Sequence, residues 1–229
     1  MDNSNDIQLK ILSVLLYKPQ SRFKDLNIDS LTTDNFSYHL RILVTTGLIQ
    51  KENSLYSLTA KGKIAAGKLD TTSYVVEKQA KIGVLLIPHK VVKGQELFLI
   101  QQRLKEPYFG YWGFMTGKVR YGETLPQTAL RELQEESGLT GECRFCYELH
   151  EMVYDQTSGQ QLEDKFFQVL EVTNLEGNLT DTIEGHNKFV PVDEFRQISP
   201  KYHNEDDILS WFLDRDFKFK EHKYYIDKF

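Results

Sequence analysis

The segment GKVRYGETLPQTALRELQEESGL, residues 117–139, is the most informative part of this chain. It fits the pattern G-x5-E-x7-R-E-U-x-E-E-x-G-U at every fixed position, where U is a bulky aliphatic residue. The fixed positions are Gly117, Glu123, Arg131, Glu132, Leu133, Glu135, Glu136, Gly138 and Leu139. So many fixed residues at fixed spacing are far more specific than a single glycine-rich loop.

The middle of this segment predicts a helix of about three turns. Thr124 is suited to the N-cap, Gln127 to a capping box with it, and Pro126 to the first turn. Gly138 is suited to the residue that ends the helix. The face that docks on a core would carry four apolar side chains, Leu125, Ala129, Leu130 and Leu133.

Three glutamates of this helix, Glu132, Glu135 and Glu136, have the spacing i, i+3, i+4 and therefore share one face. Because three crowded carboxylates repel one another, a cation must compensate for their charge. Arg131, pairing with Glu123 or Glu135, is one candidate. The other is a hard divalent cation such as Mg²⁺, which prefers carboxylate oxygens together with substrate phosphate oxygens. The alternative to a metal site is that these glutamates form a solvated acidic helix face that binds no ligand.

The complete pattern resembles the signature of the Nudix hydrolases. The resemblance implies an α/β fold, the α/β/α sandwich with a mixed sheet. It also implies cleavage of a nucleoside diphosphate linked to another group, by metal-assisted attack of water on the pyrophosphate, with Mg²⁺ or Mn²⁺. ADP-ribose, nucleotide sugars and nucleoside triphosphates all remain open as substrates.

The resemblance also implies roles for the acidic residues. Glu135 and Glu136 would bind the metal directly. Glu132 would bind a further metal or orient and deprotonate the attacking water. Glu123 and Arg131 would hold the carboxylate cluster in place.

Further site residues are expected outside the helix. The main-chain carbonyl of Thr116 would be a metal ligand, although many relatives have Gly at that position. Glu184 would complete the metal site as a late carboxylate, with Glu163 and Asp164 as rival candidates. Two basic residues would contact substrate phosphate, Arg103 and Lys118; a solvated surface role is the alternative for both.

A small domain is expected at residues 1–70. Its apolar spacing and turn residues predict helices over 7–16, 21–26, 32–46 and 59–68, and a hairpin formed by 48–51 and 55–58. The third helix would turn Phe36, Leu40, Leu43 and Val44 inward. This order of elements resembles a winged helix-turn-helix.

In that fold the third helix enters the major groove of double-stranded DNA. The residues expected to face outward for such contacts are Asn35, Ser37, Tyr38, His39 and Arg41, with Lys51 near the wing tip. Winged helices also serve as docking or dimerisation modules, so both roles stay open. The alternative function for the whole chain is therefore a DNA-binding regulator whose second domain senses a nucleotide such as ADP-ribose.

The second domain is expected at residues 79–229, after a linker at 71–78. Strands are predicted over 81–87, 96–102, 142–154, 165–172 and 188–192, and a closing helix over 204–213. The tail, 216–229, alternates aromatic residues with lysines, which indicates an edge strand or a dimer contact more than single-strand binding. We expect a homodimer.

Composition limits the class of protein. The chain has 229 residues, 40% hydrophobic and 27% charged, as in soluble globular proteins. Its net charge of −5 is uneven, because residues 1–70 hold nine basic and seven acidic side chains, a net +2. No apolar run is long enough to span a bilayer and no signal-peptide pattern begins the sequence, so a cytoplasmic protein is expected. The two cysteines, Cys143 and Cys146, lie in a predicted strand and point to opposite faces, which disfavours a zinc or redox pair.

Overall fold

The computed structural model describes residues 3–27, 29–70, 75–76 and 78–227. Two compact units make up the chain, residues 1–78 and 79–229. Most of the expected linker, 71–78, lies outside the described residues. Its described part includes β5 (Val75–Val76), which pairs with β4 (Leu69–Asp70).

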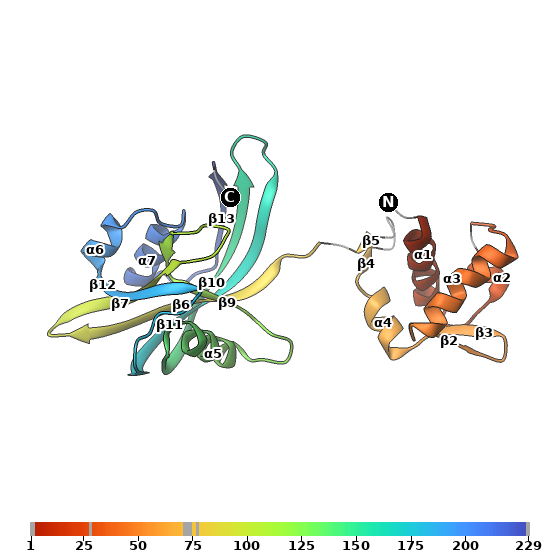
Figure 1. Ribbon diagram of the computed structural model, residues 1–229, viewed down its shortest axis with the longest axis horizontal. Helices are drawn as coiled ribbons and strands as arrows, with labels where there is room; N and C mark the ends of the chain where they lie inside the picture. The colour runs from red at the N-terminus through yellow and green to blue at the C-terminus, as the bar shows by residue number, and fades with distance from the viewer. Residues whose placement is uncertain (1–2, 28, 71–74, 77, 228–229) are drawn as a thin grey trace. The chain divides into compact units, whose positions relative to one another are not determined.

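The first unit contains four helices and a small antiparallel sheet among its described residues (Figure 1). They are α1 (Asn3–Tyr17), β1 (Ser21–Arg22), α2 (Phe23–Leu26), α3 (Thr33–Thr45), β2 (Ile49–Glu52), β3 (Leu55–Leu58) and α4 (Ala60–Ala66). The β2–β3 turn uses Asn53 and Ser54 at φ +48° and +67°, as a tight hairpin requires. One inward prediction is wrong, because Val44 is 40% exposed at the end of α3, where the helix leaves the core.

The second unit is built on a mixed sheet with the order β12-β7-β6-β11-β10-β13. Its strands are β6 (Lys81–Val92), β7 (Gln95–Arg103), β8 (Trp112–Gly113), β9 (Met115–Lys118), β10 (Leu139–Asp155), β11 (Gln161–Gly177), β12 (Gly185–Pro191) and β13 (Lys220–Ile226). The pairs β6–β11 and β10–β13 are parallel, whereas β10–β11, β6–β7, β7–β12 and β6–β9 are antiparallel. The helices are α5 (Leu125–Ser137), α6 (Val192–Gln197) and α7 (Glu205–Leu213).

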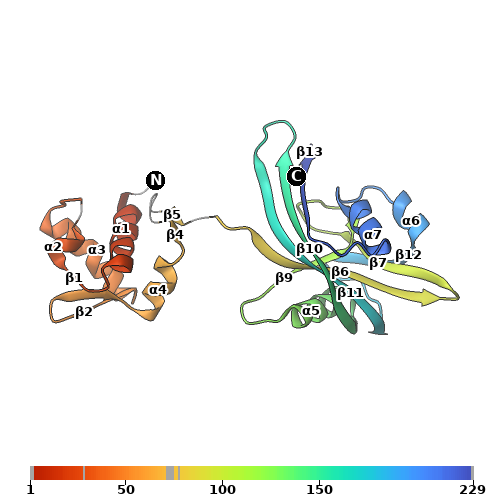
Figure 2. The same cartoon turned by 180° about the vertical axis from the view of Figure 1, so that it is seen from behind.

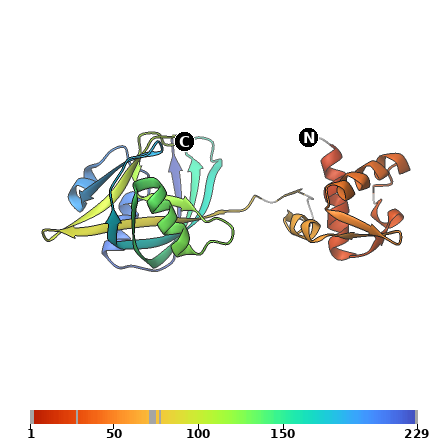
Figure 3. The same ribbon diagram turned by 60° about the horizontal axis from the view of Figure 1, so that its bottom comes forward.

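Helices cover both faces of this sheet, so the predicted α/β/α sandwich is confirmed (Figures 1 and 2). Figure 3 shows α5 lying across the strands. The core beneath α5 is formed by alternate strand residues and the apolar face of the helix, including Val84, Leu86, Ala129, Leu133 and Leu170. The core on the opposite face includes Leu85, Phe98, Tyr147, Phe195 and Phe212. This alternation is what strands buried on both faces require.

The C-terminal tail forms β13, which runs parallel to β10 at the edge of the sheet (Figure 2). The edge-strand interpretation of the tail therefore fits the structure. Cys143 packs beside the α5 core and Cys146 in the opposite core, so the two thiols lie on opposite faces of β10. None of the helices in the described residues has the length and apolar character needed to cross a membrane.

Candidate active site

The position of α5 is fixed by its two ends. The Thr124 N–H donates to Oε1 of Gln127 at 2.9 Å, and the Gln127 N–H donates to Oγ1 of Thr124, as in the predicted capping box. Gly138 ends the helix at φ +74°, a left-handed conformation that glycine adopts without strain. Both ends are therefore set by local sequence, and they fix which side chains face the sheet.

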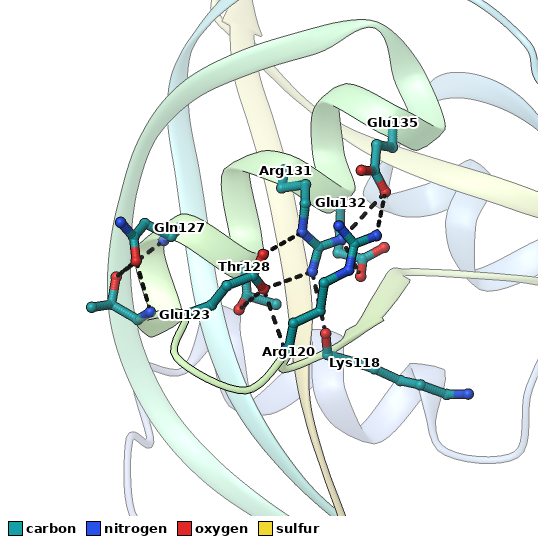
Figure 4. Close-up of polar contacts among 9 residues, drawn as sticks. Lys118, Arg120, Glu123, Gln127, Thr128, Arg131, Glu132 and Glu135 are labelled. Carbon is teal, nitrogen blue, oxygen red and sulfur yellow. Dashed lines mark hydrogen bonds and ion pairs between the residues drawn. The ribbon is translucent and has the colours of Figure 1, made fainter.

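Arg131 is the centre of an ion-pair network on this helix (Figure 4). Its Nε and Nη2 donate to the two carboxylate oxygens of Glu123 at 2.7 and 2.8 Å, and Nη1 donates to Glu132 at 2.7 Å and to Glu135 at 3.2 Å. The hydrogen bonds from Arg131, followed by one from Thr128, lower the pKa of Glu123 to about 2. The pKa of Arg131 is raised in turn, chiefly by Glu123. The pairing expected from sequence is present, and one guanidinium is shared by three carboxylates.

The strand before the helix comes very close to Glu132. A Cβ atom built on Gly117 would lie 2.1 Å from Cγ of Glu132. Only glycine therefore permits this approach of β9 to α5.

A cleft of about 660 Å³ lies beside this network. Glu132 and Glu136 both line it, together with Gln101 and the basic residues Arg103 and Lys105. Glu135 does not line the cleft. Its side chain is 49% exposed and also accepts a hydrogen bond from Arg120 at 3.4 Å.

Glu136 is the carboxylate most affected by its surroundings. Burial, followed by repulsion from the neighbouring Glu132, raises its pKa to about 7, while Lys105, Gln101 and Arg103 oppose the shift. Burial also lowers the pKa of Lys105, followed by repulsion from Arg103. Acidic and basic side chains therefore share one poorly solvated cleft, where charges interact strongly.

The two predicted phosphate contacts both line the cleft. The Arg103 guanidinium donates to three main-chain carbonyls of the following loop, those of Lys105 (2.9 Å), Glu106 (3.3 Å) and Pro107 (2.7 Å). It therefore shapes the loop, and its contact with phosphate stays a prediction. Lys118 has an exposed side chain, and its carbonyl accepts a hydrogen bond from Arg131 at 3.3 Å.

The other predicted ligands fall at different places. Thr116 and Glu184 line the cleft, and Glu184 forms an ion pair with Lys105. Of its rivals, Glu163 lines the cleft, whereas Asp164 does not and instead lies 2.9 Å from His150 Nε2. Asp164 is therefore the least suited of the three to complete a metal site.

A further set of polar residues lines the cleft and is not indicated by any motif in the sequence. They are Glu151 on β10, Lys165 on β11, and His203, Asn204 and Glu205 at the start of α7. Glu151 and Glu205 are each 3% exposed. Glu205 accepts the Phe114 N–H at 3.0 Å, and burial raises its pKa well above the usual range. The sequence does carry a signal for Glu151, which is a charged residue at an inward position of a strand. It lies two residues from each of the buried Leu149 and Val153 and therefore on the same face.

Of the residues predicted to contact DNA, all except His39 are exposed. Asn35, Ser37, Tyr38 and Arg41 are exposed on α3, and Lys51 is exposed on β2. His39 is not outward, as was expected, but only 3% exposed, with Nε2 at 3.1 Å from Oδ1 of Asn35. It lies three residues after the buried Phe36, so the helical period carries it into the core.

Comparison with known proteins identifies the second unit. The NUDIX domain family model matches residues 78–212, which is more than half of the chain. The chain belongs to the Nudix family. This confirms the resemblance carried by residues 117–139.

One relative and two solved structures show how far the similarity extends. A segment of 47 residues is 45% identical to an 8-oxo-dGTP diphosphatase of Proteus vulgaris; it covers 20% of this chain and 42% of that protein. The NUDIX domain of Shewanella oneidensis NrtR, complexed with ADP ribose, superposes with a TM-score of 0.53 at 16% identity, covering 69% of this chain and 99% of that one. A MutT protein from Bacillus halodurans gives a TM-score of 0.54 at 22% identity, covering 65% and 93%. At such identities the two structures establish the fold alone.

Proposed function

We propose that this Nudix protein hydrolyses a nucleoside diphosphate linked to another group, using a divalent cation. The observation that carries the proposal is the cleft itself. The helix carboxylates Glu132 and Glu136 line it together with the basic side chains of Arg103, Lys105 and Lys118. A diphosphate needs both kinds of wall, because a metal must be held and phosphate charge must be neutralised.

The residues fit a divalent cation such as Mg²⁺ or Mn²⁺. Glu136 is desolvated, so its ionised form needs a compensating positive charge. Among the described residues no three acidic, histidine or cysteine side chains converge on one point. Mg²⁺ commonly uses one or two carboxylates with substrate phosphate oxygens and water. Glu136 would supply one of those carboxylates, and Glu132 either a second one or the proton acceptor for water, with the Thr116 carbonyl and Glu184 as further ligands. Glu135, which lies outside the cleft, is less suited to bind the ion directly. When bound, the cation neutralises diphosphate oxygens and acidifies a water molecule.

The protein groups would then divide the remaining work. Arg131 fixes Glu132 through their 2.7 Å hydrogen bond, which places a carboxylate at the cleft to accept a proton from the attacking water. Lys105 and Lys118 would bind phosphate oxygens, and Arg103 would hold the loop that carries Lys105. No serine or cysteine nucleophile is needed, since water attacks phosphorus directly.

Two observations bear on the substrate. The segment shared with an 8-oxo-dGTP diphosphatase favours a nucleoside triphosphate. The fold shared with a domain that was crystallised with ADP ribose keeps that compound in the set. Nucleotide sugars complete the set of candidates.

The test is product formation with Mg²⁺ from ADP-ribose, NADH, nucleotide sugars, canonical and oxidised triphosphates, and dinucleoside polyphosphates. Glu136→Gln should lower turnover on the order of 10³-fold, while the matched variant Glu176→Gln, at an exposed site on β11, should leave it intact. Equal turnover by the wild type and Glu136→Gln would refute the proposal.

A second candidate function is DNA binding by the first unit. The observation in its favour is the exposed polar face of α3, where the Arg41 guanidinium lies 5.9 Å from the Tyr38 ring centroid. A mobility-shift assay at low salt, with and without ADP-ribose, tests it, with Arg41→Ala as the variant expected to lose binding. The predicted homodimer is tested by light scattering on the same preparation.

A further inference from the structure

Three lysines converge on the cleft from neighbouring strands. They are Lys165 on β11, Lys81 on β6 and Lys118 on β9, and all three line the cleft. Strand β6 lies between the other two strands. Lys81 is the register partner of Lys165, and Gly83, two residues further along β6, is the partner of Lys118. The strand pairing therefore sets the three side chains at one end of the sheet.

Two of these lysines share one carboxylate as their ion-pair partner, although Glu151 also attracts Lys165 from within the cleft. Glu163 forms ion pairs with both Lys165 and Lys81, the latter at 3.6 Å. Lys118 has no ion pair within the part of the chain that the structure describes. One carboxylate is thus shared by two ammonium groups while a third lysine stands beside them. Glu163 is consequently a poor metal ligand, because two cations already occupy its oxygens.

Burial increases the cost of this arrangement. The Lys165 side chain is only 25% exposed, and its Nζ lies 5.7 Å from the Phe167 ring centroid. Burial lowers the pKa of Lys165 to about 8; Glu151 opposes the shift, and Lys81, Arg103 and Lys118 add to it. Lys81 and Lys118 are exposed to water, so the cost falls on Lys165, whose poorly solvated ammonium group needs an anion to compensate for its like-charged neighbours. A purely structural role does not explain why two lysines, Lys81 and Lys165, share the single carboxylate of Glu163.

We propose that Lys81 and Lys165, next to the diphosphate contact Lys118, form a second anion subsite, which binds a phosphate group of the substrate beyond the diphosphate bond addressed by Glu132 and Glu136. The inference rests on the proposed function and narrows its substrate class. It favours nucleoside triphosphates, polyphosphates or compounds with a phosphorylated distal group. ADP-ribose and nucleotide sugars without a further phosphate would leave the subsite empty.

The test is calorimetric binding of inorganic pyrophosphate to the full chain in metal-free buffer containing EDTA. Lys165→Met and Lys81→Met keep most of the side-chain stem and should each weaken binding about tenfold. Glu163→Gln should strengthen binding, because it releases both lysines from their carboxylate. Lys218→Met is the matched control, since this side chain is 86% exposed and lies 3.9 Å from Asp216, a residue that does not line the cleft.

Opposite signs for the lysine and glutamate variants would support the subsite. A structural role would make all three variants weaken binding through loss of the ion pairs, and that result would overturn the proposal. Pyrophosphate binding unchanged in the lysine variants, or absent from the wild type, would overturn it as well. Because this measurement needs neither metal nor turnover, its failure is distinct from failure of the hydrolase assignment, which the Glu136→Gln comparison tests.

A kinetic measurement extends the same comparison. In Lys165→Met, kcat/KM for a nucleoside triphosphate should fall about tenfold, whereas kcat/KM for ADP-ribose should change less than about twofold. Equal losses for both substrates would show that the lysine supports the site as a whole, which contradicts the proposal.

Discussion

The helix side and the strand side of the cleft differ in how their charges pair: one cation is shared by several carboxylates on α5, and one carboxylate is shared by two cations on the strands. On the α5 side one arginine, Arg131, is shared by three glutamates, of which Glu132 lines the cleft, and the desolvated Glu136 lines it as well. On the strand wall one glutamate, Glu163, is shared by two lysines, with Lys118 close by. Each wall therefore needs a partner of opposite charge. A metal ion bound to a phosphorylated substrate, as proposed for this cleft, would supply both partners at once.

The largest expected effect comes from removing charge on the acidic wall. Glu136→Gln should lower kcat on the order of 10³-fold, because it removes the carboxylate that we propose as a metal ligand. Its thermal midpoint should stay equal or rise, since the substitution removes a desolvated carboxylate. Steady-state kinetics and calorimetry measure the two quantities. A fall in kcat with a collapse of the thermal midpoint would instead indicate a structural defect.

Gly117→Ala should disturb the contact between the acidic wall and β9. The new Cβ would lie 2.1 Å from Cγ of Glu132, which should cost about 1–3 kcal/mol in the free energy of unfolding and displace that carboxylate. Denaturant unfolding measures the loss. Gly122→Ala is the control, because it meets nothing within 4 Å and bears only the strain of φ +91°, about 1–2 kcal/mol. Activity retained in Gly117→Ala would argue against the placement of Glu132.

Arg131 should make stability depend on pH in the acidic range. Hydrogen bonds from Arg131 lower the pKa of Glu123 to about 2 from an ordinary value of 4.5. A lowered carboxyl pKa stabilises the fold above pH 4.5, and this contribution is lost as the pH falls toward 2. Unfolding curves should show this loss in the wild type and a weaker pH dependence in Arg131→Met. Identical pH profiles would contradict the ion-pair network.

A smaller effect, on the pKa of Glu136, is expected from removing its basic neighbour Lys105. Lys105 lowers the pKa of Glu136, so Lys105→Met should move that pKa upward from about 7. Carbon-13 NMR titration of the glutamate carboxyls in metal-free protein measures the direction of the shift. A downward shift would mean that the lysine does not act on Glu136 through its charge.

The predictable features of this molecule were those set by local sequence. The ends of α5 and the pairing of Arg131 with Glu123 follow from short spacings within residues 117–139, and the structure contains them. The further polar residues of the cleft could not be predicted from local sequence, because pairing and packing between distant segments bring them together. Lys81 meets Lys165 only through the parallel pairing of β6 and β11, and Glu205 reaches the cleft only through the packing of α7.

His39 shows a different kind of error. Its distance of three residues from the buried Phe36 already indicated an inward side chain. A polar side chain favours an outward position, but the helical period places His39 inward. Burial of this histidine leaves four of the predicted α3 residues exposed for a DNA contact.

The most direct test of the account is hydrolysis of a nucleoside triphosphate in ¹⁸O-labelled water with Mg²⁺, followed by mass spectrometry of the products. Label is expected in a phosphoryl group of one product, with none in the presence of EDTA and only a trace in Glu136→Gln over the same time. Label that enters equally in Glu136→Gln, or no product from any nucleoside diphosphate compound, would contradict it.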